Sequence, residues 1–411
     1  MPQPAARPEP VQQHERLARA ERVDRDLHRH LTTLVTLRST IVTENRTVAA
    51  PHTAGDRLVV CDVALFYAER SGGIRTYLNE KARFAAQTEA LEHHVIVPGK
   101  RERHLGGRHE LRSLQLAASN GYRLPLGAGP LRETLRAIRP DVVILHDPFW
   151  RPLSVTREAH RLGATVVAVH HASPALHAAG IPGPDLLYLP ALKKIYQHAY
   201  EHVDAVMSIV DTEPDCGRSA AIKLRFGLDP AFRPGPAVPG DELLYVGRLS
   251  LEKRIADILE AMALAGSKRP LRIVGDGPAR GLIESRARRL GLAHRVEFRP
   301  FVADRRALAR LYREAACVVA PGPHETFGLA VLEAAASGAR VVACSSTPAA
   351  AVAGPLVQTF RPKKPKDLVR AIARALATPR DPAAASALGD SMRWERVFEA
   401  ELGNLKHLCC Q

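Results

Sequence analysis

The sequence predicts an α/β protein with two doubly wound domains, each a parallel sheet covered by helices on both faces. Apolar strand-like runs alternate with helical patterns from residue 57 onward, and the alternation restarts after a Pro- and Gly-rich break at residues 226–240. With 411 residues, 46% of them hydrophobic, the chain can form two cores. We divide it into a helical or disordered extension (1–56), two domains (57–236 and 237–382) and a C-terminal helical segment (383–411).

Five apolar runs predict strands in each domain. Those of the first are Leu58–Val63, His94–Val97, Val142–His146, Thr165–His170 and Ala205–Ile209. Those of the second are Leu243–Val246, Leu271–Val274, Val296–Phe298, Cys317–Ala320 and Arg340–Ala343. Helical patterns between them include Ile74–Ala86, Leu187–His202, Lys253–Leu264, Ala307–Ala316 and Phe327–Ser337. Short connections predict parallel strands throughout, so we expect ligands beyond the carboxyl ends of the strands, in a cleft between the domains.

The chain is strongly basic, with a net charge of +15 at pH 7. Nucleic acid, an anionic membrane surface and phosphate-bearing small molecules are the three partners that such a charge suits. Aromatic residues make up only 5% of the chain, and none is interleaved with the basic clusters. Because single-stranded nucleic acid is bound by stacking bases on aromatic rings, we expect no nucleic-acid partner.

The extension at residues 1–56 has eight arginines and seven carboxylates, so the excess positive charge lies in the rest of the chain. Five of its apolar residues fall roughly on one helical face: Leu17, Leu27, Leu31, Leu34 and Ile41. We interpret it as a loosely attached helix, or as upstream sequence included by a wrong start codon. The alternative is a coiled-coil or membrane-surface arm, and the low net charge counts against the membrane arm.

Several absences predict a cytoplasmic protein. No apolar run reaches the roughly 18 residues that a spanning helix needs, and the N-terminus MPQPAARPEP lacks the apolar core of a secretory signal. The six cysteines include no CxxC pair, which argues against zinc and fits a reducing compartment. Cys61, Cys317 and Cys344 lie in apolar runs and are predicted to be small core residues.

Two carboxylates stand eight residues apart in the stretch PHETFGLAVLEAAASG. Glu325 is expected just before a helix that starts near Phe327, and Glu333 two turns inside it. The first N–H groups of a helix attract phosphate, and carboxylates accept hydrogen bonds from pairs of hydroxyls. We predict a nucleotide-sugar site, with the diphosphate on the amides of Phe327, Gly328 and Leu329. The alternative is that both acids only stabilise the helix through its dipole.

Further segments also point to phosphate. The block GRLSLEK places Arg248 and Lys253, five residues apart, at the carboxyl end of a strand, where they could neutralise a diphosphate. Gly72 and Gly73 follow the first strand and let the backbone approach a phosphate. A pair of solvated charges and a plain tight turn are the respective alternatives. The turn VGDGP could border a base pocket, and we favour a turn without that role.

Histidines end two neighbouring strands of the first domain: His146 is followed by Asp147, and His170 by His171. Two strand ends that present histidine to one cleft favour a catalytic role over a structural one. These four residues could also supply metal ligands, but neither HxH nor HExxH spacing is present. The only DxD pattern, DRD, lies in the extension. We therefore predict no metal site and no cofactor.

Together, these blocks resemble the retaining glycosyltransferases of the GT-B group called family 4, over about residues 57–405. ETFGL with Glu333 matches the E-x7-E signature of that family, GRLSLEK its Arg and Lys pair for the diphosphate, and SGGIRTYL its glycine loop. VAVHHAS matches its strand-end histidine block; the best register places the catalytic histidine at His171, with His170 the alternate. The resemblance implies two Rossmann-like domains facing a cleft, and a C-terminal helix near Trp394–Leu405 that packs back on the first domain.

The resemblance further implies that a sugar, with mannose or glucose the best guess, moves from a nucleotide-diphosphate donor to a hydroxyl acceptor with retention. Arg248, Lys253 and the helix amides would stabilise the leaving diphosphate without a metal, and Glu325 and Glu333 would hold sugar and ribose hydroxyls. SGGIRTYL is most similar to actinobacterial GDP-mannose-dependent enzymes that modify lipid-linked or other membrane acceptors. Three departures stand out: Arg254 replaces a usual Gly, FG replaces the interdomain PNG, and SSTPAAAVAG lacks the usual acid.

Two other classes remain open from the sequence alone. One is a sugar-nucleotide epimerase of the same architecture, and the other is a basic protein that binds membrane or nucleic acid and whose transferase site is degenerate. Six basic residues of the first domain predict peripheral binding to anionic lipid, with a solvated loop as the alternative. They are Lys100, Arg101, Arg103, Arg108, Lys193 and Lys194.

Overall fold

The computed structural model describes residues 57–65, 67, 73–115, 123–125, 127–146, 152–170, 185–208, 219–325 and 327–410. They all belong to one compact unit, Ala49–Gln411. The N-terminal extension, Gly72, Asp147 and His171 lie outside the described residues.

The first domain contains a nine-stranded sheet in the order β3-β4-β2-β1-β6-β7-β8-β9, with β5 paired to β4. The strands are β1 (Leu58–Val63), β2 (Leu91–Gly99), β3 (Arg103–Leu105), β4 (Arg108–Gln115), β5 (Arg123–Pro125), β6 (Val142–Leu145), β7 (Thr165–His170), β8 (Ala205–Ser208) and β9 (Ala220–Lys223). The helices are α2 (Gly73–Ala85), α3 (Gly129–Ile138), α4 (Pro152–Arg161) and α6 (Asp185–Tyr200). All five predicted strands are present.

The second domain contains a six-stranded sheet, parallel throughout, in the order β12-β11-β10-β13-β14-β15. The strands are β10 (Leu243–Val246), β11 (Leu271–Val274), β12 (Val296–Arg299), β13 (Cys317–Ala320), β14 (Val341–Cys344) and β15 (Val357–Phe360). The helices are α7 (Ala256–Leu264), α8 (Arg280–Arg289), α9 (Arg305–Glu314), α10 (Leu329–Ala336), α11 (Pro348–Ala353), α12 (Pro365–Ala377), α13 (Pro382–Ser391) and α14 (Trp394–Cys409). Three short 3-10 helices are η1 (Leu251–Lys253), η2 (Ala293–Arg295) and η3 (Gly354–Leu356).

The prediction that every strand is parallel is wrong at one edge of the first sheet. Strand β4 runs antiparallel to both β3 and β5. The two-residue turn Gly106-Gly107 joins β3 to β4, and Gly106 adopts φ 54°. Such a turn reverses the chain directly, whereas a parallel connection needs a crossover of a dozen residues or more. The GG pair was therefore the sequence signal for this hairpin.

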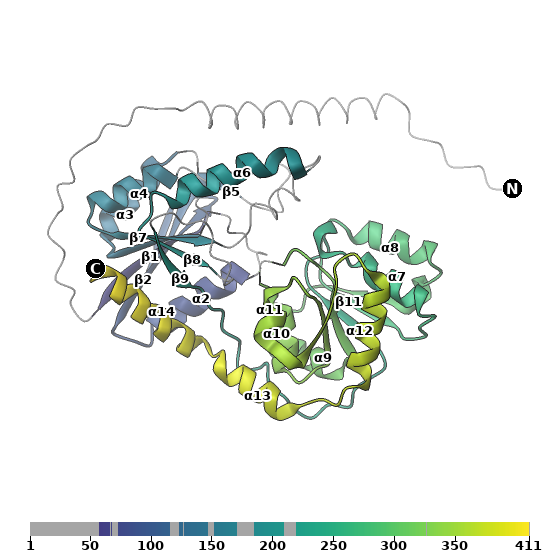
Figure 1. Cartoon of the computed structure of the whole chain (residues 1–411). Helices are drawn as coiled ribbons and strands as arrows, with labels where there is room; N and C mark the ends of the chain where they lie inside the picture. The colour runs from purple at the N-terminus through teal and green to yellow at the C-terminus, as the bar shows by residue number, and fades with distance from the viewer. Residues whose placement is uncertain are drawn as a thin grey trace, which may run out of the picture. The chain divides into compact units, whose positions relative to one another are not determined.

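Helices cover both faces of each sheet (Figure 1). One core cluster packs α3, α4 and α6 on the first sheet, and another packs α7, α8 and α12 on the second. A third cluster is continuous from α2 and α14 to α9, α10 and α11, so apolar packing joins the two domains. Cys61, Cys317 and Cys344 are buried in these cores, as the sequence predicts.

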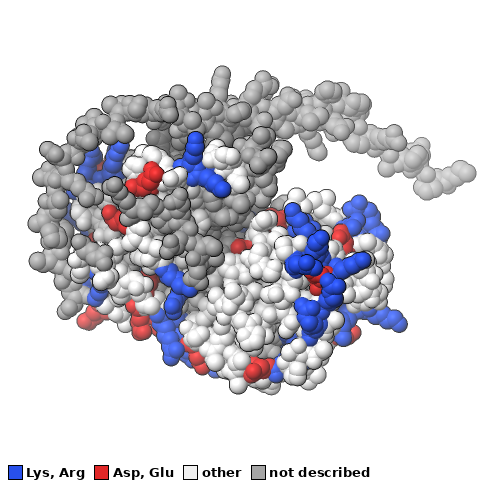
Figure 2. All heavy atoms as spheres, in the orientation of Figure 1, with Lys and Arg blue, Asp and Glu red and all other residues white. Residues whose placement is uncertain are grey.

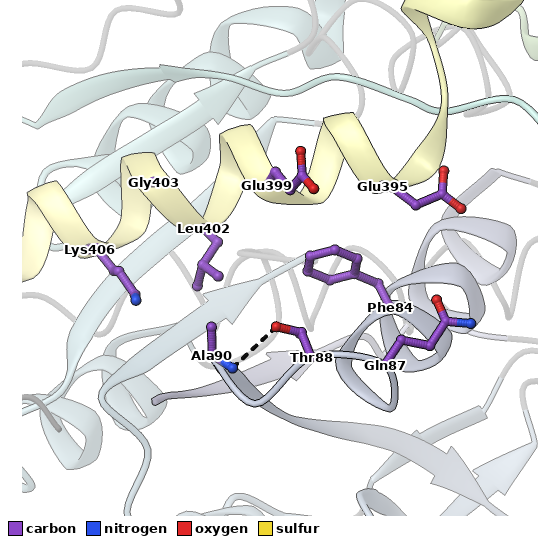
Figure 3. A pocket seen from close by; sticks show the side chains of 9 residues that line it. All are labelled: Phe84, Gln87, Thr88, Ala90, Glu395, Glu399, Leu402, Gly403 and Lys406. Atoms are coloured by element: carbon purple, nitrogen blue, oxygen red, sulfur yellow. Dashed lines mark hydrogen bonds between the residues drawn. The ribbon is translucent and has the colours of Figure 1, made fainter. Parts of the chain in front are cut away.

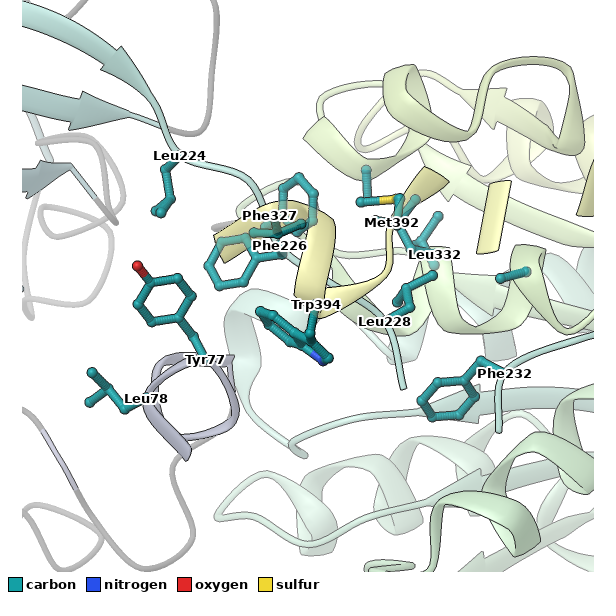
Figure 4. Close-up of a cluster of buried hydrophobic side chains, with 14 of the residues drawn as sticks. Tyr77, Leu78, Leu224, Phe226, Leu228, Phe232, Phe327, Leu332, Met392 and Trp394 are labelled. Atoms are coloured by element: carbon teal, nitrogen blue, oxygen red, sulfur yellow. The ribbon is translucent and has the colours of Figure 1, made fainter. Parts of the chain in front are cut away.

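The chain passes between the domains twice, and the two passages lie together. The N–H of Leu228 donates to the carbonyl of Met392 at 2.6 Å. A Cβ atom at Gly227 would lie 2.3 Å from the ring of Trp394, so only glycine fits there. Figure 4 shows Phe226 and Trp394 in the same buried cluster as Tyr77. Beyond this point α13 packs on α10 and α14 packs on α2, so the C-terminal segment contacts both domains.

Candidate active site

The order of the strands determines where the predicted residues meet. In the second sheet the order reverses between β10 and β13, and in the first between β1 and β6. Doubly wound sheets bind ligands at this reversal, beyond the carboxyl ends of the strands. Arg248 follows β10 and Glu325 follows β13, while Gly73 and His146 occupy the equivalent places of the first sheet. The predicted residues thus lie at the two reversals.

Lys253 and Glu325 form an ion pair across the reversal of the second sheet. The distance from Lys253 Nζ to Glu325 Oε2 is 2.6 Å, and both side chains are partly buried. Gly322 lets the two loops approach, because a Cβ there would lie 3.2 Å from Lys253 Cα. By contrast, no described residue pairs with the Arg248 guanidinium, which is therefore available to an anionic ligand. Lys253 lies in η1, not in the following helix as predicted.

The turn VGDGP packs closely on the loop that carries Arg248. A Cβ at Gly275 would lie 2.0 Å from the carbonyl oxygen of Gly247, and one at Gly277 would lie 2.2 Å from that of Leu249. The N–H of Leu249 donates to the carbonyl of Asp276 at 3.0 Å. Two glycines are therefore needed for the close backbone packing of this turn.

Helix α10 begins at Leu329, two residues later than the predicted start near Phe327. Gly328 adopts φ 93°, and a Cβ there would lie 2.6 Å from Thr347 Cγ2, so glycine is required. The Phe327 ring is buried and stacks on Phe226 at 5.0 Å between centroids. The first turn of α10 is thus held from both sides, with its leading N–H groups at the edge where Arg248 lies.

The glycine-loop helix α2 begins against the start of α10. A Cβ at Gly73 would lie 3.3 Å from Leu329 Cδ1 and 4.0 Å from Phe226 Cε1. The first residue of α2 therefore reaches the first residue of α10, although 255 residues separate them in the chain. The structure thus brings Gly73 and Leu329 together, as a shared donor site requires.

Glu333 lies inside α10 with its carboxylate only 13% exposed. Its Oε2 accepts from the Tyr312 hydroxyl at 3.0 Å, and Arg305 approaches its Oε1 at 3.5 Å. Burial raises the pKa of Glu333 above its ordinary value, although Arg305 and the hydrogen bond from Tyr312 act in the opposite direction. Arg305 also lies 3.4 Å from Thr76 of α2. Sequence reasoning missed Arg305 and Tyr312, whose spacing of seven places them on one face of α9.

The two strand-end histidines that the structure describes, His146 and His170, are held by neighbouring side chains. His146 is buried, and its Nε2 lies 2.6 Å from Asp62 Oδ1. His170 Nδ1 lies 2.6 Å from the Tyr200 hydroxyl. Among the described residues, no three His, Cys, Asp or Glu side chains group so that they could hold a metal ion. His171, predicted to be catalytic, lies outside the described residues, as does Gly72.

A buried charge network lies behind α2. Lys81 Nζ is 2.8 Å from Asp62 Oδ2 and 2.8 Å from Glu401 Oε1, and the three side chains are 1%, 0% and 7% exposed. His93 Nε2 lies 2.8 Å from Asp62 Oδ2. Burial alone would raise the pKa of Asp62, but Lys81 and the two histidines hold it well below its usual range. Asp62 could have been suspected from the sequence, because it is a charge inside the apolar run LVVCDV.

Arg254, where the resembled family usually has Gly, adopts φ 49° and ψ 38°, the left-handed conformation that favours Gly. Its guanidinium forms two hydrogen bonds to the buried carboxylate of Asp257, each 2.8 Å long. We expect Arg254→Gly to lower the free energy of unfolding by about 1–2 kcal/mol, because it leaves that carboxylate unpaired. In an Asp257→Ala background the same change should instead stabilise by about 1 kcal/mol, since only strain is relieved. Urea unfolding of the four proteins measures both, and the same sign in both backgrounds would contradict this account.

The two α/β domains have mainly parallel sheets, and the start of α10 meets Gly73. Arg248 has no partner among the described residues and is available to a phosphate. This fold and this site are those of a GT-B glycosyltransferase. Family models agree, since residues 232–390 match "Glycosyl transferases group 1" and residues 71–212 match "Glycosyltransferase Family 4". The chain therefore belongs to the glycosyltransferase family that these two models describe, and it is a hexosyltransferase.

Curated relatives point the same way. A GDP-mannose-dependent alpha-(1-6)-phosphatidylinositol dimannoside mannosyltransferase of Mycobacterium tuberculosis (strain ATCC 25177 / H37Ra) is 35% identical over 312 residues, covering 69% of this chain and 78% of the relative. A D-inositol 3-phosphate glycosyltransferase of Frankia alni is 35% identical over 164 residues, covering 37% of this chain and 38% of the relative.

Solved structures share the fold. Sucrose-phosphate synthase of Thermosynechococcus elongatus aligns with a TM-score of 0.64 at 18% identity, over 86% of this chain and 98% of that one. HepE of Anabaena, solved with UDP and glucose, aligns with a TM-score of 0.66 at 13% identity, over 85% of this chain and 100% of that one.

Proposed function

We propose that this chain transfers mannose from GDP-mannose to a hydroxyl group of a lipid-linked acceptor, with retention at the anomeric carbon. The observation that carries the proposal is that Gly73 meets the start of α10, while Arg248 follows β10 at the strand reversal of the same sheet as α10. The sugar and nucleotide rest on the relative of Mycobacterium tuberculosis, whose name gives GDP-mannose as its donor and a phosphatidylinositol mannoside as its acceptor.

The chemistry follows from charge. The leaving diphosphate gains negative charge as its bond to the sugar breaks, and Arg248, Lys253 and the first amides of α10 would stabilise it. Glu325, held by Lys253 at 2.6 Å, would accept hydrogen bonds from sugar hydroxyls. Glu333 would accept from the ribose diol, and Tyr312 keeps its carboxylate in place. His171 would lie beside the reacting sugar, and the diphosphate itself would assist deprotonation of the acceptor on the same face.

A donor panel tests this function. GDP-, UDP- and ADP-sugars are compared by thermal shift, and then by transfer to phosphatidylinositol mannosides and to soluble sugars. At about 100 times its Kd, the true donor should add roughly 2.7 kcal/mol to the free energy of unfolding. Anomeric configuration is read from the product by NMR. Transfer only from another donor, or an inverted product, would contradict the corresponding part of the proposal.

Metal independence is a separate prediction. Transfer should persist in excess EDTA, because two cations and the helix amides already supply the positive charge that a metal would bring. The measurement is initial rate with and without EDTA, followed by added Mg²⁺. A complete loss that Mg²⁺ restores would reveal a metal requirement.

The acceptor proposal includes peripheral membrane binding through the β3–β4 hairpin. Lys100 and Arg101 just before the hairpin and Arg103 within it are exposed, and Leu105, two residues after Arg103, is 60% exposed. Arg108 is partly engaged, because it pairs with Glu110 at 3.0 Å. In the part of the chain that the structure describes, every helix is too short or too polar to span a bilayer. Each exposed basic group near an anionic surface contributes about 1 kcal/mol, which salt screens.

We expect co-sedimentation with vesicles rich in anionic lipid that falls steeply with salt. Serine at positions 100, 101, 103 and 108 should weaken it. Basic side chains also gather over α8 and α12 on the face drawn in Figure 2. Exposed Arg288 and Arg289 of α8 therefore provide a control for the loss of positive charge away from the hairpin. Serine at those two positions should leave binding in place. Equal recovery of the protein with neutral and with anionic vesicles would contradict binding through these charges, and it would favour a soluble acceptor instead.

A further inference from the structure

Helix α2, which begins at Gly73, contacts the C-terminal helix α14 through buried polar and charged side chains. Tyr77 and Lys81 lie four residues apart on α2, hence on one face of it. The Tyr77 hydroxyl donates to Glu401 Oε2, and Lys81 Nζ lies 2.8 Å from Glu401 Oε1. A single carboxylate of α14 therefore engages two successive turns of α2. On the other side of Lys81, Asp62 anchors the same group to β1 at 2.8 Å.

Aromatic rings also pack between α2 and α14. Phe398 lies 5.4 Å from Tyr77 and 5.6 Å from Phe84 between ring centroids. At the far end of α2, a hollow of about 540 Å³ lies between the two helices. Figure 3 shows Phe84 of α2 on one side of this hollow, with Glu399 and Leu402 of α14 on the other.

A buried charged contact is a poor way to gain stability, because apolar residues of the same volume often stabilise as well or better. What such a contact provides is one defined register between the helices that it joins. That register matters here because α2 begins at Gly73, which reaches Leu329 of the donor helix. A shift of α2 would move Gly73 relative to the start of α10.

We infer that Glu401 is a positioning residue for the transfer reaction: through Tyr77 and Lys81 it sets α2, and with it Gly73 at the start of that helix, against the nucleotide-sugar diphosphate. The inference rests on the proposed function. Glu401 touches no substrate, and its influence passes through α2. A misplacement of about 1 Å at a reacting centre can lower the rate about a hundredfold, so loosening of α2 is visible in kinetics.

The test uses Glu401→Gln, which keeps the size and the hydrogen-bonding oxygen but removes the charge, and which leaves the Lys81–Asp62 pair intact. Exposed Glu399→Gln on the same helix is the matched control. We expect Glu401→Gln to lower kcat about tenfold with little change in the acceptor KM, while its melting temperature stays within about 4 °C of the wild type. Tyr77→Phe should act similarly, and the double variant should be no slower than either single one.

Hydrogen–deuterium exchange of residues 73–85 provides a readout that needs no activity. Glu401→Gln should speed exchange in the first turn of α2, and Glu399→Gln should not. Unchanged exchange, additive kinetic effects, or equal kcat for the two glutamate variants would overturn the inference. A wild type without transfer from any donor would refute the proposed function, and the exchange experiment would still decide whether Glu401 positions α2.

Discussion

Arg248→Ala is expected to lower kcat by about two to three orders of magnitude, the effect of removing one preorganised contact to a leaving group. Arg248 follows β10 at the strand reversal. Its guanidinium pairs with no described residue, so its charge is available to the departing diphosphate. For the same reason its removal should leave the melting temperature nearly unchanged. Steady-state transfer and donor hydrolysis measure the rate, and thermal unfolding measures the stability.

Two variants sharpen the result. Arg248→Lys should be intermediate, because it keeps the charge and loses the planar two-pronged donor. Lys253→Ala should lower kcat to a similar extent but also release Glu325 from its 2.6 Å ion pair, so its effect combines two losses. Full activity of Arg248→Ala would remove Arg248 from the proposed donor site.

Lys81→Met is expected to lower the free energy of unfolding by about 3–5 kcal/mol, because it leaves the carboxylates of Asp62 and Glu401 buried without their common cation. Methionine has nearly the length of lysine, so lost packing contributes little. Urea unfolding measures the change, and Arg83→Met on the same helix is the control. Arg83 is 70% exposed and pairs with Glu80, so its loss should change stability by less than about 1 kcal/mol.

The sign of the Lys81→Met effect is checked by neutralising the acids. Adding Asp62→Asn and Glu401→Gln should recover much of the stability, since no unpaired charge then remains buried. The deficit should also shrink as the pH falls. In the wild type, burial raises the pKa of Asp62, but Lys81 and the two histidines hold it well below its usual range, and this stabilising contribution is lost once Asp62 is protonated. A Lys81→Met protein within about 1 kcal/mol of the wild type at pH 7 would contradict the account.

Local patterns were sufficient for most of the architecture. The ten strands expected from apolar runs are all present, and Gly338 ends the α10 segment at φ 76°. Buried parallel strands are continuous apolar runs, so they are easy to recognise. The edge hairpin was missed because β3 is exposed along its whole length and has no apolar pattern. Strands β9 and β15 were missed because both are short and only partly apolar.

The sequence alone determined the two-domain α/β class and the family blocks, and it supplied the residue types of the proposed donor site, because motif chemistry and strand periodicity are local properties. Only the tertiary structure decided which groups meet across long separations. Lys253 pairs with Glu325, Gly73 reaches Leu329, and Tyr312 and Arg305 hold Glu333. The sequence predicted that the C-terminal helix packs on the first domain, but the partnership of Glu401 with Lys81 depends on which faces of α14 and α2 meet, and only the tertiary structure shows that.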